Sequence, residues 1–290
     1  MRRLWAAALV AACHPARPPP PPAAVRAAPA ADAGPASDPA QLFWEKRNAD
    51  PGALDQAVAL FEDEALHSAD PAPLLLSAAR ARRERMWRSE RRADLDPAET
   101  ARAQSEDAQA CAADARRSWA AQFPSAAARA DRLPPSEIDA QIGVAGAEAL
   151  YLEAVCSAAW ARLQGFTPLI ERRTELLAAF ARVAQLVPDL DGAGGERELG
   201  ALQAALPSYA GGDLLQARQH LEAAVARAPR DPRNRLTLAR TVAVKAQDRA
   251  LFEEQLRAVL AGGDPSAAAD ATALLQREDD LFGPTDAAPR

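Results

Sequence analysis

Side chains that commonly perform catalysis or bind metals are scarce in this sequence. Its 290 residues include three histidines and three cysteines. Glu64 and His67 have the spacing of half a di-iron site, which also needs a second Glu-x-x-His motif and further glutamates on facing helices. The sequence contains no second copy of this motif. We therefore interpret Glu64 and His67 as part of a solvated helix end.

Other motifs of enzymatic chemistry are also missing. The sequence has no HExxH, no CxxC and no serine nucleophile elbow. His14 falls in a proline-rich segment, and His220 is expected to border the interface of a helical hairpin. We therefore predict a non-enzymatic protein with neither a metal nor a cofactor.

The N-terminal residues have the pattern of an export signal that ends at Cys13. Met1-Arg2-Arg3 precedes a short apolar stretch, and Val10-Ala11-Ala12-Cys13 has the form of a bacterial lipobox. We predict a lipoprotein signal peptide over 1–12 and lipidation of Cys13; the alternative is a buried helix with a stray cysteine. His14 follows Cys13, where an aspartate would favour inner-membrane retention, so the predicted location is the periplasmic side of the envelope, at the outer membrane rather than the inner one.

A tether follows the predicted anchor. Residues 13–36 are rich in Pro and Ala and include five consecutive prolines, Pro18 to Pro22. Proline lacks an N–H and has a fixed φ, so the segment is expected to be an extended polyproline II spacer that reaches on the order of 70 Å. A ligand for an SH3-like partner is the alternative. No run of 18 apolar residues occurs, so the membrane is contacted through the acyl chains.

Cys111 and Cys156 both fall on predicted helices of the mature domain. The periplasm is oxidising, which favours a disulfide between two such thiols. Two buried small hydrophobic residues are the alternative interpretation. Both remain open at this point.

The charge pattern argues against nucleic-acid binding. The net charge is −6, which does not provide the cationic surface that phosphate backbones require. One basic stretch stands out and is interrupted by Glu84 and Glu90. It comprises Arg80, Arg82, Arg83, Arg85, Arg88, Arg91 and Arg92. We interpret it as a solvated helix with ion pairs; the alternative is contact with anionic lipid or an acidic partner.

From about residue 37 onward the apolar residues recur at three- and four-residue spacing, which predicts helices alone. Asp-Pro pairs and an Asp213-x-x-Gln216 capping box indicate several helix starts. We predict one helical domain over 37–283 and a disordered tail over 284–290. The expected helices are 38–49, 53–68, 72–93, 97–121, 136–163, 168–187, 196–207, 213–228, 233–246, 249–261 and 265–281.

The sequence of these predicted helices contains a repeat pattern. Relative to Ala217, Gly occurs at −5, Leu at +4, Ala at +7 and Pro at +12. This spacing matches the second half of a tetratricopeptide repeat (TPR). The predicted fold is therefore all-α: a TPR-like α-solenoid of about ten or eleven helices stacked as antiparallel hairpins. An ordinary helical bundle is the alternative.

The C-terminal half resembles a known family. The residues that carry the resemblance are Gly194, Gly195, Gly200, Leu206, Pro207, Gly211, Gly212, Asp213, Ala217, Ala224 and Pro229. His220, Asn234-Arg235, the segment 247–252 and the Trp160 helix continue it. Over roughly 147–262 the chain resembles the T-component (TatT) family of TRAP transporters, whereas over 37–146 only the helical pattern agrees.

The resemblance implies a periplasmic TPR-like lipoprotein that is accessory to a TRAP transporter. By the same resemblance, its partner is the periplasmic substrate-binding protein of that system, with a small ligand in a central cavity and a homo-oligomeric assembly. Few aromatic residues flank Trp160, which departs from an aromatic-lined ligand chamber. The alternative function is that of a generic TPR-type envelope lipoprotein that aids the assembly of outer-membrane or secretion complexes.

The glycines of the motif have a conformational interpretation. Gly192, Gly194 and Gly195, and likewise Gly211 and Gly212, permit the positive φ angles of tight connections between helices. A phosphate cradle is the alternative, but no strand precedes either group and neither matches a phosphate-binding fingerprint.

Overall fold

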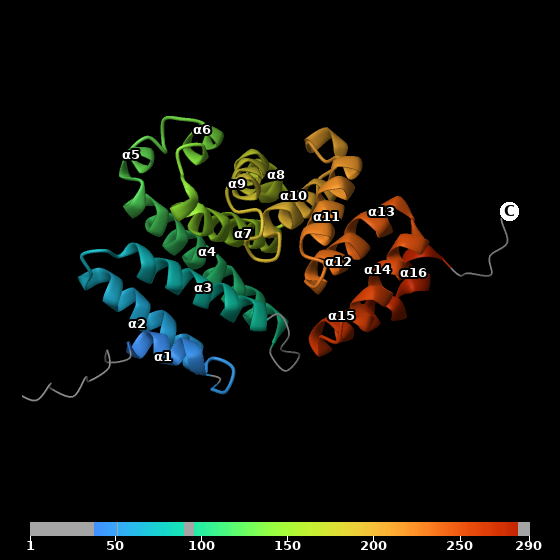
Figure 1. Ribbon diagram of the computed structural model, residues 1–290, viewed down its shortest axis with the longest axis horizontal. Coiled ribbons are helices and arrows are strands. Elements are labelled where there is room, and N and C mark those ends of the chain that lie inside the picture. The colour runs from blue at the N-terminus through green and yellow to red at the C-terminus, as the bar shows by residue number, and fades with distance from the viewer. Residues whose placement is uncertain (1–37, 51, 90–95, 284–290) are drawn as a thin grey trace, which may run out of the picture. The chain divides into compact units, whose positions relative to one another are not determined.

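The computed structural model describes residues 38–50, 52–89 and 96–283, and within these ranges every regular element is helical (Figure 1). The predicted all-α class is therefore confirmed. Cys13, the segments 1–12, 13–36 and 284–290, and Arg91 and Arg92 lie outside the described residues. No helix in the described part of the chain is long and apolar enough to cross a membrane.

The helices follow one another with short connections. In the first half they are α1 (Pro39–Lys46), α2 (Ala53–His67), α3 (Ala72–Ser89), α4 (Pro97–Gln122), α5 (Pro124–Ala127), α6 (Pro135–Asp139), η1 (Val144–Gly146) and α7 (Ala147–Gln164). The second half comprises α8 (Phe166–Glu171), α9 (Arg173–Leu186), α10 (Gly194–Ala205), η2 (Ser208–Ala210), α11 (Leu214–Arg227), α12 (Pro232–Leu238), η3 (Ala239–Ala243), α13 (Val244–Ala246), α14 (Arg249–Ala261), α15 (Pro265–Gln276) and α16 (Glu278–Phe282).

Aspartates begin many of these helices as predicted. The side chains of Asp38, Asp96 and Asp264 each accept a hydrogen bond from a backbone N–H of the first turn, and a proline follows each. Asp213 caps α11 by accepting from the Gln216 N–H at 3.0 Å. The predicted box is different in detail, because the Gln216 side-chain amide donates to the Asp213 carboxylate at 3.0 Å and not to the backbone of the cap.

The single helix expected over 136–163 is wrong. The structure divides it into α6, an extended Gly143, η1 and α7. Phe123, which ends α4, packs against this corner: a Cβ at Gly146 would lie 2.5 Å from its ring. Arg182 of α9 donates to the backbone carbonyls of Ala140 and Ile142, so the broken segment is held by tertiary contacts.

The helix expected over 168–187 is also divided, into α8 and α9. The chain enters α8 through Gly165 at φ +115°, so the predicted Thr167-Pro168 start lies inside the helix. The expected helix over 233–246 contains a π-turn, η3, between α12 and α13.

Packing proceeds from each helix to its neighbours in the series. Helix α3 packs between α2 and α4, α7 contacts both α4 and α9, and α10 contacts α9 and α11 (Figure 1). The largest core lies around α4, α6, α7, α9 and α10 and includes Trp119, Tyr151 and Phe180. A second core joins α10 to the helices after it and includes Leu221 and Phe252.

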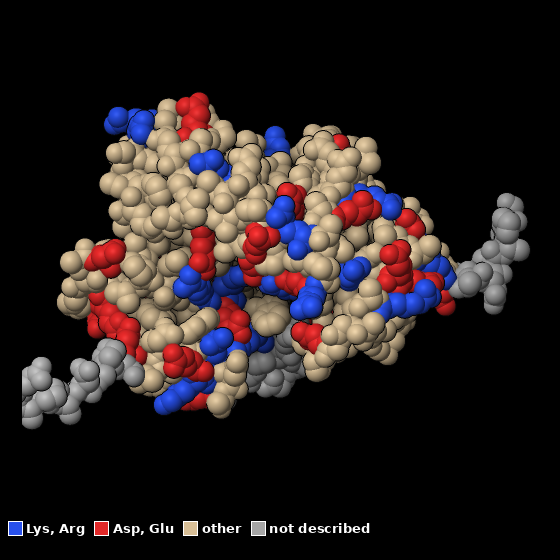
Figure 2. All heavy atoms as spheres, viewed as in Figure 1, with Lys and Arg blue, Asp and Glu red and all other residues tan. Residues whose placement is uncertain are grey.

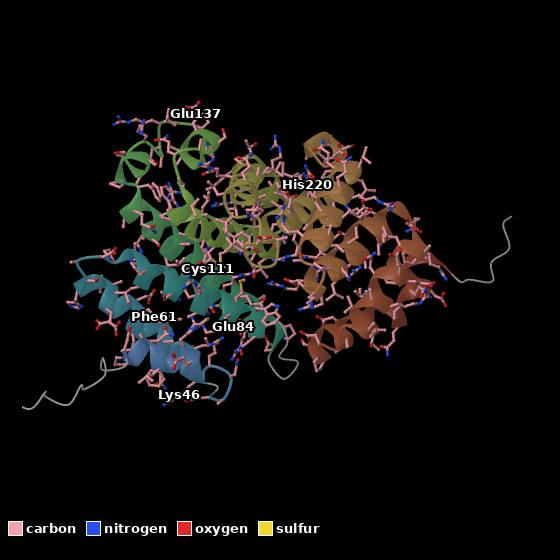
Figure 3. The ribbon with its side chains drawn as sticks, viewed as in Figure 1. Lys46, Phe61, Glu84, Cys111, Glu137 and His220 are labelled. Atoms are coloured by element: carbon pink, nitrogen blue, oxygen red, sulfur yellow. A yellow bond between two sulfur atoms is a disulfide. The ribbon has the colours of Figure 1, made fainter. Side chains whose placement is uncertain are left out.

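A disulfide joins α4 to α7. Cys111 and Cys156 are fully buried, their sulfur atoms are bonded, and their Cα atoms are 6.0 Å apart, within the range that disulfides require (Figure 3). Ala79 of α3 and Leu152 of α7 pack around the bond. Of the two interpretations that the sequence left open, the structure therefore has the crosslinked one.

The disulfide gives the first testable prediction. The Cys111→Ala/Cys156→Ala variant should lose roughly 2–4 kcal/mol of unfolding free energy, because the bond closes a 45-residue loop in the unfolded chain. Urea titration measures this loss. Mass spectrometry of the unreduced protein provides the control, and two free thiols there would contradict the bond.

Candidate functional site

A partly buried polar centre lies in the connection between α9 and α10. The carboxylate of Asp191 accepts hydrogen bonds from four side chains, each on a different helix, and we call these five residues the Asp191 cluster. The donors are Arg83 at 2.7 Å, Tyr151 at 2.7 Å, Arg197 at 2.8 Å and Arg233 at 2.8 Å. The cluster therefore connects α3, α7, α10 and α12.

The electrostatics of the cluster favour an ionised Asp191. Burial by itself would raise the pKa of this carboxyl group. The guanidinium groups of Arg83, Arg197 and Arg233 outweigh burial and hold the pKa of Asp191 well below its usual range. Burial raises the pKa of the Tyr151 hydroxyl, which stays protonated and donates to Asp191.

The backbone around Asp191 is unusual. Asp191, Gly192 and Ala193 all have positive φ angles, of 51°, 64° and 63°. A Cβ at Gly192 would lie 2.0 Å from Asp231 Oδ2, so only glycine fits there. Asn234, which is fully buried, donates to the Gly192 carbonyl at 3.0 Å and so fixes this turn to α12.

The predicted motif residues lie close to this turn and in the α10–α11 hairpin. Gly194, Gly195, Gly200 and Gly212 mark close approaches, because a Cβ at each would come within 3.0 Å of a neighbouring atom. Gly211 has φ +87°. The buried members are Leu206, Ala217 and Ala224, while Pro207 precedes η2 and Pro229 is exposed after α11. These residues shape the hairpin, and no phosphate-binding geometry follows from them.

The basic stretch on α3 is not solvated as expected. Its described arginines are partly buried and paired with carboxylates. Arg80, Arg82 and Arg85 pair with other helices, Arg83 pairs with Asp191 in the α9–α10 connection, and Arg88 pairs with Glu84 of its own helix. Arg82 contacts Asp114 of α4 at 3.1 Å and also pairs with Glu62 of α2, and Arg85 pairs with Asp55 of α2 at 2.6 Å. Figure 2 shows acidic and basic side chains interleaved on this face. The stretch thus joins α3 to its neighbours.

The histidines occupy minor positions. His67 Nδ1 lies 2.8 Å from the Asp63 carbonyl of its own helix; His67 is exposed and Glu64 is half-buried. His220 of α11 lies 2.6 Å from Glu196 of α10, at the hairpin interface where it is expected (Figure 3). Among the described residues no group of His, Cys, Asp and Glu could hold a metal ion.

A cavity of about 230 Å³ lies between α4, α6, α7 and α9. Its apolar wall includes Trp119, Ile138, Leu150, Ala154, Leu176 and Ala179. Three carboxyl groups and one guanidinium also line it: Asp139, Glu153, Glu175 and Arg116. The cavity is therefore lined by both apolar and charged side chains, with an excess of acidic groups.

Two of these acids are strongly perturbed. Burial, reinforced by the charges of Glu153 and Glu175, raises the pKa of Asp139 to about 7. Burial also raises the pKa of Glu153 to about 7, although the Trp119 indole donates to it and Arg116 lies 3.5 Å away. Both acids therefore change charge near neutral pH.

Sequence reasoning missed the Asp191 cluster and the cavity. Asp191 is one of three aspartates next to a glycine, and its four partners lie 6 to 108 residues away in the chain. The only available signal for the cluster was the glycine-rich turn itself. Asp139 falls in the segment expected as a continuous helix, which gave no reason to place it at a cavity wall.

The fold and the cavity define an all-α protein of sequentially packed helices around a small, acid-lined chamber. A comparison with protein-family models matches residues 84–282 to the TRAP transporter T-component. Because this match covers more than half of the chain, the protein belongs to the T-component family, as the resemblance predicted. Membership supports an accessory role in a TRAP transporter. A search among curated proteins finds no match.

Asp191 provides the second testable prediction. Asp191→Asn should lower the unfolding free energy by roughly 2–3 kcal/mol, because it removes the carboxylate that three arginines share, while Arg197 and Arg233 keep Asp231 as a partner. Asp189→Asn is the matched control: Asp189 is exposed and pairs only at the surface with Arg227, so its loss should change stability by under about 0.5 kcal/mol.

The pH dependence of unfolding checks the same interaction. The pKa of Asp191 is lower in the folded chain than in the unfolded one, so its stabilisation is fully present above about pH 4 and is lost as the pH falls further. Asp191→Asn should remove this part of the acid destabilisation. Equal stabilities of the two aspartate variants would contradict the central role of the cluster.

Proposed function

We propose that this chain is a lipid-anchored periplasmic scaffold that holds the substrate-binding protein of a TRAP transporter. The family match over 84–282 is the observation that carries this proposal. The export signal and Cys13 support attachment to the envelope, with the Pro-rich segment 13–36 as spacer. The favoured membrane is the outer one.

The packing of helices supports a TPR-like solenoid as the scaffold. In the described residues each long helix contacts mainly its neighbours in the chain, from α1 and α2 to α14 and α15. Repeat proteins pack in this way and use extended surfaces to bind other proteins. Assembly of several copies belongs to the same proposal.

Two exposed apolar residues mark a surface for the partner. Tyr209 of η2 is 84% exposed and Leu215 of α11 is 67% exposed, and both lie within the family match. Tyrosine is enriched at energetically important positions of protein interfaces. We therefore assign the substrate-binding protein to the face of the α10–α11 hairpin that carries these two side chains.

Lipidation is the third testable prediction. Cells that express the full chain and are fed radiolabelled palmitate should label it, and Cys13→Ser should abolish the label and release the chain from membranes, because the acyl chains supply the anchor. Cys111→Ser serves as the control and should keep the label. An unlabelled full chain would contradict the anchor.

Partner binding is the fourth prediction. The full chain in detergent, immobilised for surface plasmon resonance, should bind the substrate-binding protein of the TRAP system from the same cell. Tyr209→Ala/Leu215→Ser should weaken this binding at least about tenfold, as loss of an interface anchor does. Leu66→Ser is the matched control, since Leu66 is 75% exposed but lies outside the family match.

The outcome separates the two candidate functions. Absence of binding to the cognate substrate-binding protein would contradict the transporter scaffold. Capture of a component of outer-membrane or secretion machinery in its place would favour the generic envelope lipoprotein. Equal loss of binding in the Leu66 variant would contradict the assignment of the hairpin face.

A further inference from the structure

The cavity between α4, α6, α7 and α9 contains a carboxyl oxygen without a partner. Asp139 is 7% exposed, it lines the cavity, and its Oδ2 atom is buried without a hydrogen bond. Burial of an unpaired polar group is unfavourable, and most such groups in proteins have a partner. A bound molecule that donates a hydrogen bond to Asp139 Oδ2 would explain this buried oxygen.

The fixed positive charges around the cavity are already engaged. Arg116 of α4 faces Glu153 at 3.5 Å, and Arg172, which precedes α9, faces Glu175 at 3.8 Å. Arg182 of α9 donates to two backbone carbonyls, at 2.9 Å and 3.2 Å. The charge of Arg182 lowers the pKa of Asp139, but no arginine of these helices forms an ion pair with Asp139 among the described residues. A ligand cation could therefore pair with this carboxyl group.

The remaining walls suit a short apolar body. Trp119, Ile138, Leu150 and Leu176 are buried and line the cavity. The volume of about 230 Å³ corresponds to roughly eight water molecules, which is below the size of most drug-like ligands. Arg116 lies over the Trp119 ring, with its Cζ atom 5.9 Å from the ring centroid, so this ring offers the ligand apolar contact.

We propose that this cavity binds a small primary amine, with its ammonium group donating to Asp139 and its apolar body against Trp119 and Leu176. Glu153 and Glu175 are paired with Arg116 and Arg172, but the cavity lining still has three carboxyl groups and one guanidinium, which disfavours anions. The proposal depends on the cavity alone and stands whether or not the substrate-binding protein binds at the α10–α11 hairpin. It is also independent of whether the amine is cargo of a transporter or a resident ligand.

Three probes of equal size test the charge requirement. Isothermal titration calorimetry of the full chain in detergent at pH 8 should show binding of benzylamine, and binding of benzyl alcohol and benzoate at least tenfold weaker. Benzoate or benzyl alcohol binding as tightly as benzylamine would overturn the proposal. Absence of measurable benzylamine binding at millimolar concentration would overturn it as well.

Two variants test the location. Asp139→Asn should weaken benzylamine binding at least tenfold, and Ala154→Leu, which fills the cavity from α7, should abolish it. Glu137→Gln is the matched control, because Glu137 lies on the same short helix but is exposed (Figure 3). Unchanged affinity in both cavity variants would overturn the assignment. If Asp139→Asn fails to fold in circular dichroism, the three probes and Ala154→Leu decide.

The pH dependence gives an independent readout. Asp139 and Glu153 have pKa values raised to about 7, whereas an alkylammonium group stays protonated between pH 6 and pH 8. Benzylamine should therefore bind at least about tenfold more weakly at pH 6 than at pH 8, with proton release that calorimetry detects in buffers of different ionisation enthalpy. Affinity that is unchanged or increased at pH 6 would contradict pairing with these carboxylates.

Discussion

Side chains from four helices converge on the carboxylate of Asp191, and the connection between the two main cores depends on this convergence. A buried charge is costly unless it is paired and hydrogen-bonded. Three guanidinium groups and one hydroxyl donate hydrogen bonds to the Asp191 carboxylate. The ends of these four side chains must therefore lie close to one point. This constraint sets where α3, α7, α10 and α12 approach each other. The positive φ angles of the turn at Asp191 follow from the same requirement.

The α3 arginines extend this principle toward the N-terminal helices. Arg82 and Arg85 pair with carboxylates of α2 and α4, while Arg83 of the same helix reaches the Asp191 cluster. Ion pairs of this kind contribute less to net stability than apolar burial does, but they penalise any arrangement that leaves a charge unpaired. The disulfide between Cys111 and Cys156 adds a covalent restraint at the junction of α4 and α7. The helices around the cavity are thereby held in place.

The cavity has two features that a packed protein core does not combine. Its wall is apolar, yet Asp139 and Glu153 lie in it with pKa values near neutrality. Other interactions in the fold offset the free-energy cost of burying these carboxyl groups. Acids with shifted pKa values in a cavity are typical of binding sites. The exposed Tyr209 and Leu215 lie at a separate location, in the α10–α11 hairpin. The proposed partner surface and the proposed ligand cavity therefore lie in different parts of the fold.

Local signals in the sequence determined the helices, their aspartate caps and the glycine-rich hairpin, because helix periodicity, caps and positive-φ turns depend on residues close in the chain. The motif over 194–229 was sufficient for the family. Tertiary structure decided the rest. Phe123 and Arg182 break the helix expected over 136–163, since their contacts outweigh its helical propensity. The Asp191 cluster and the cavity join residues far apart in the chain, and no local pattern records which of many aspartates becomes buried.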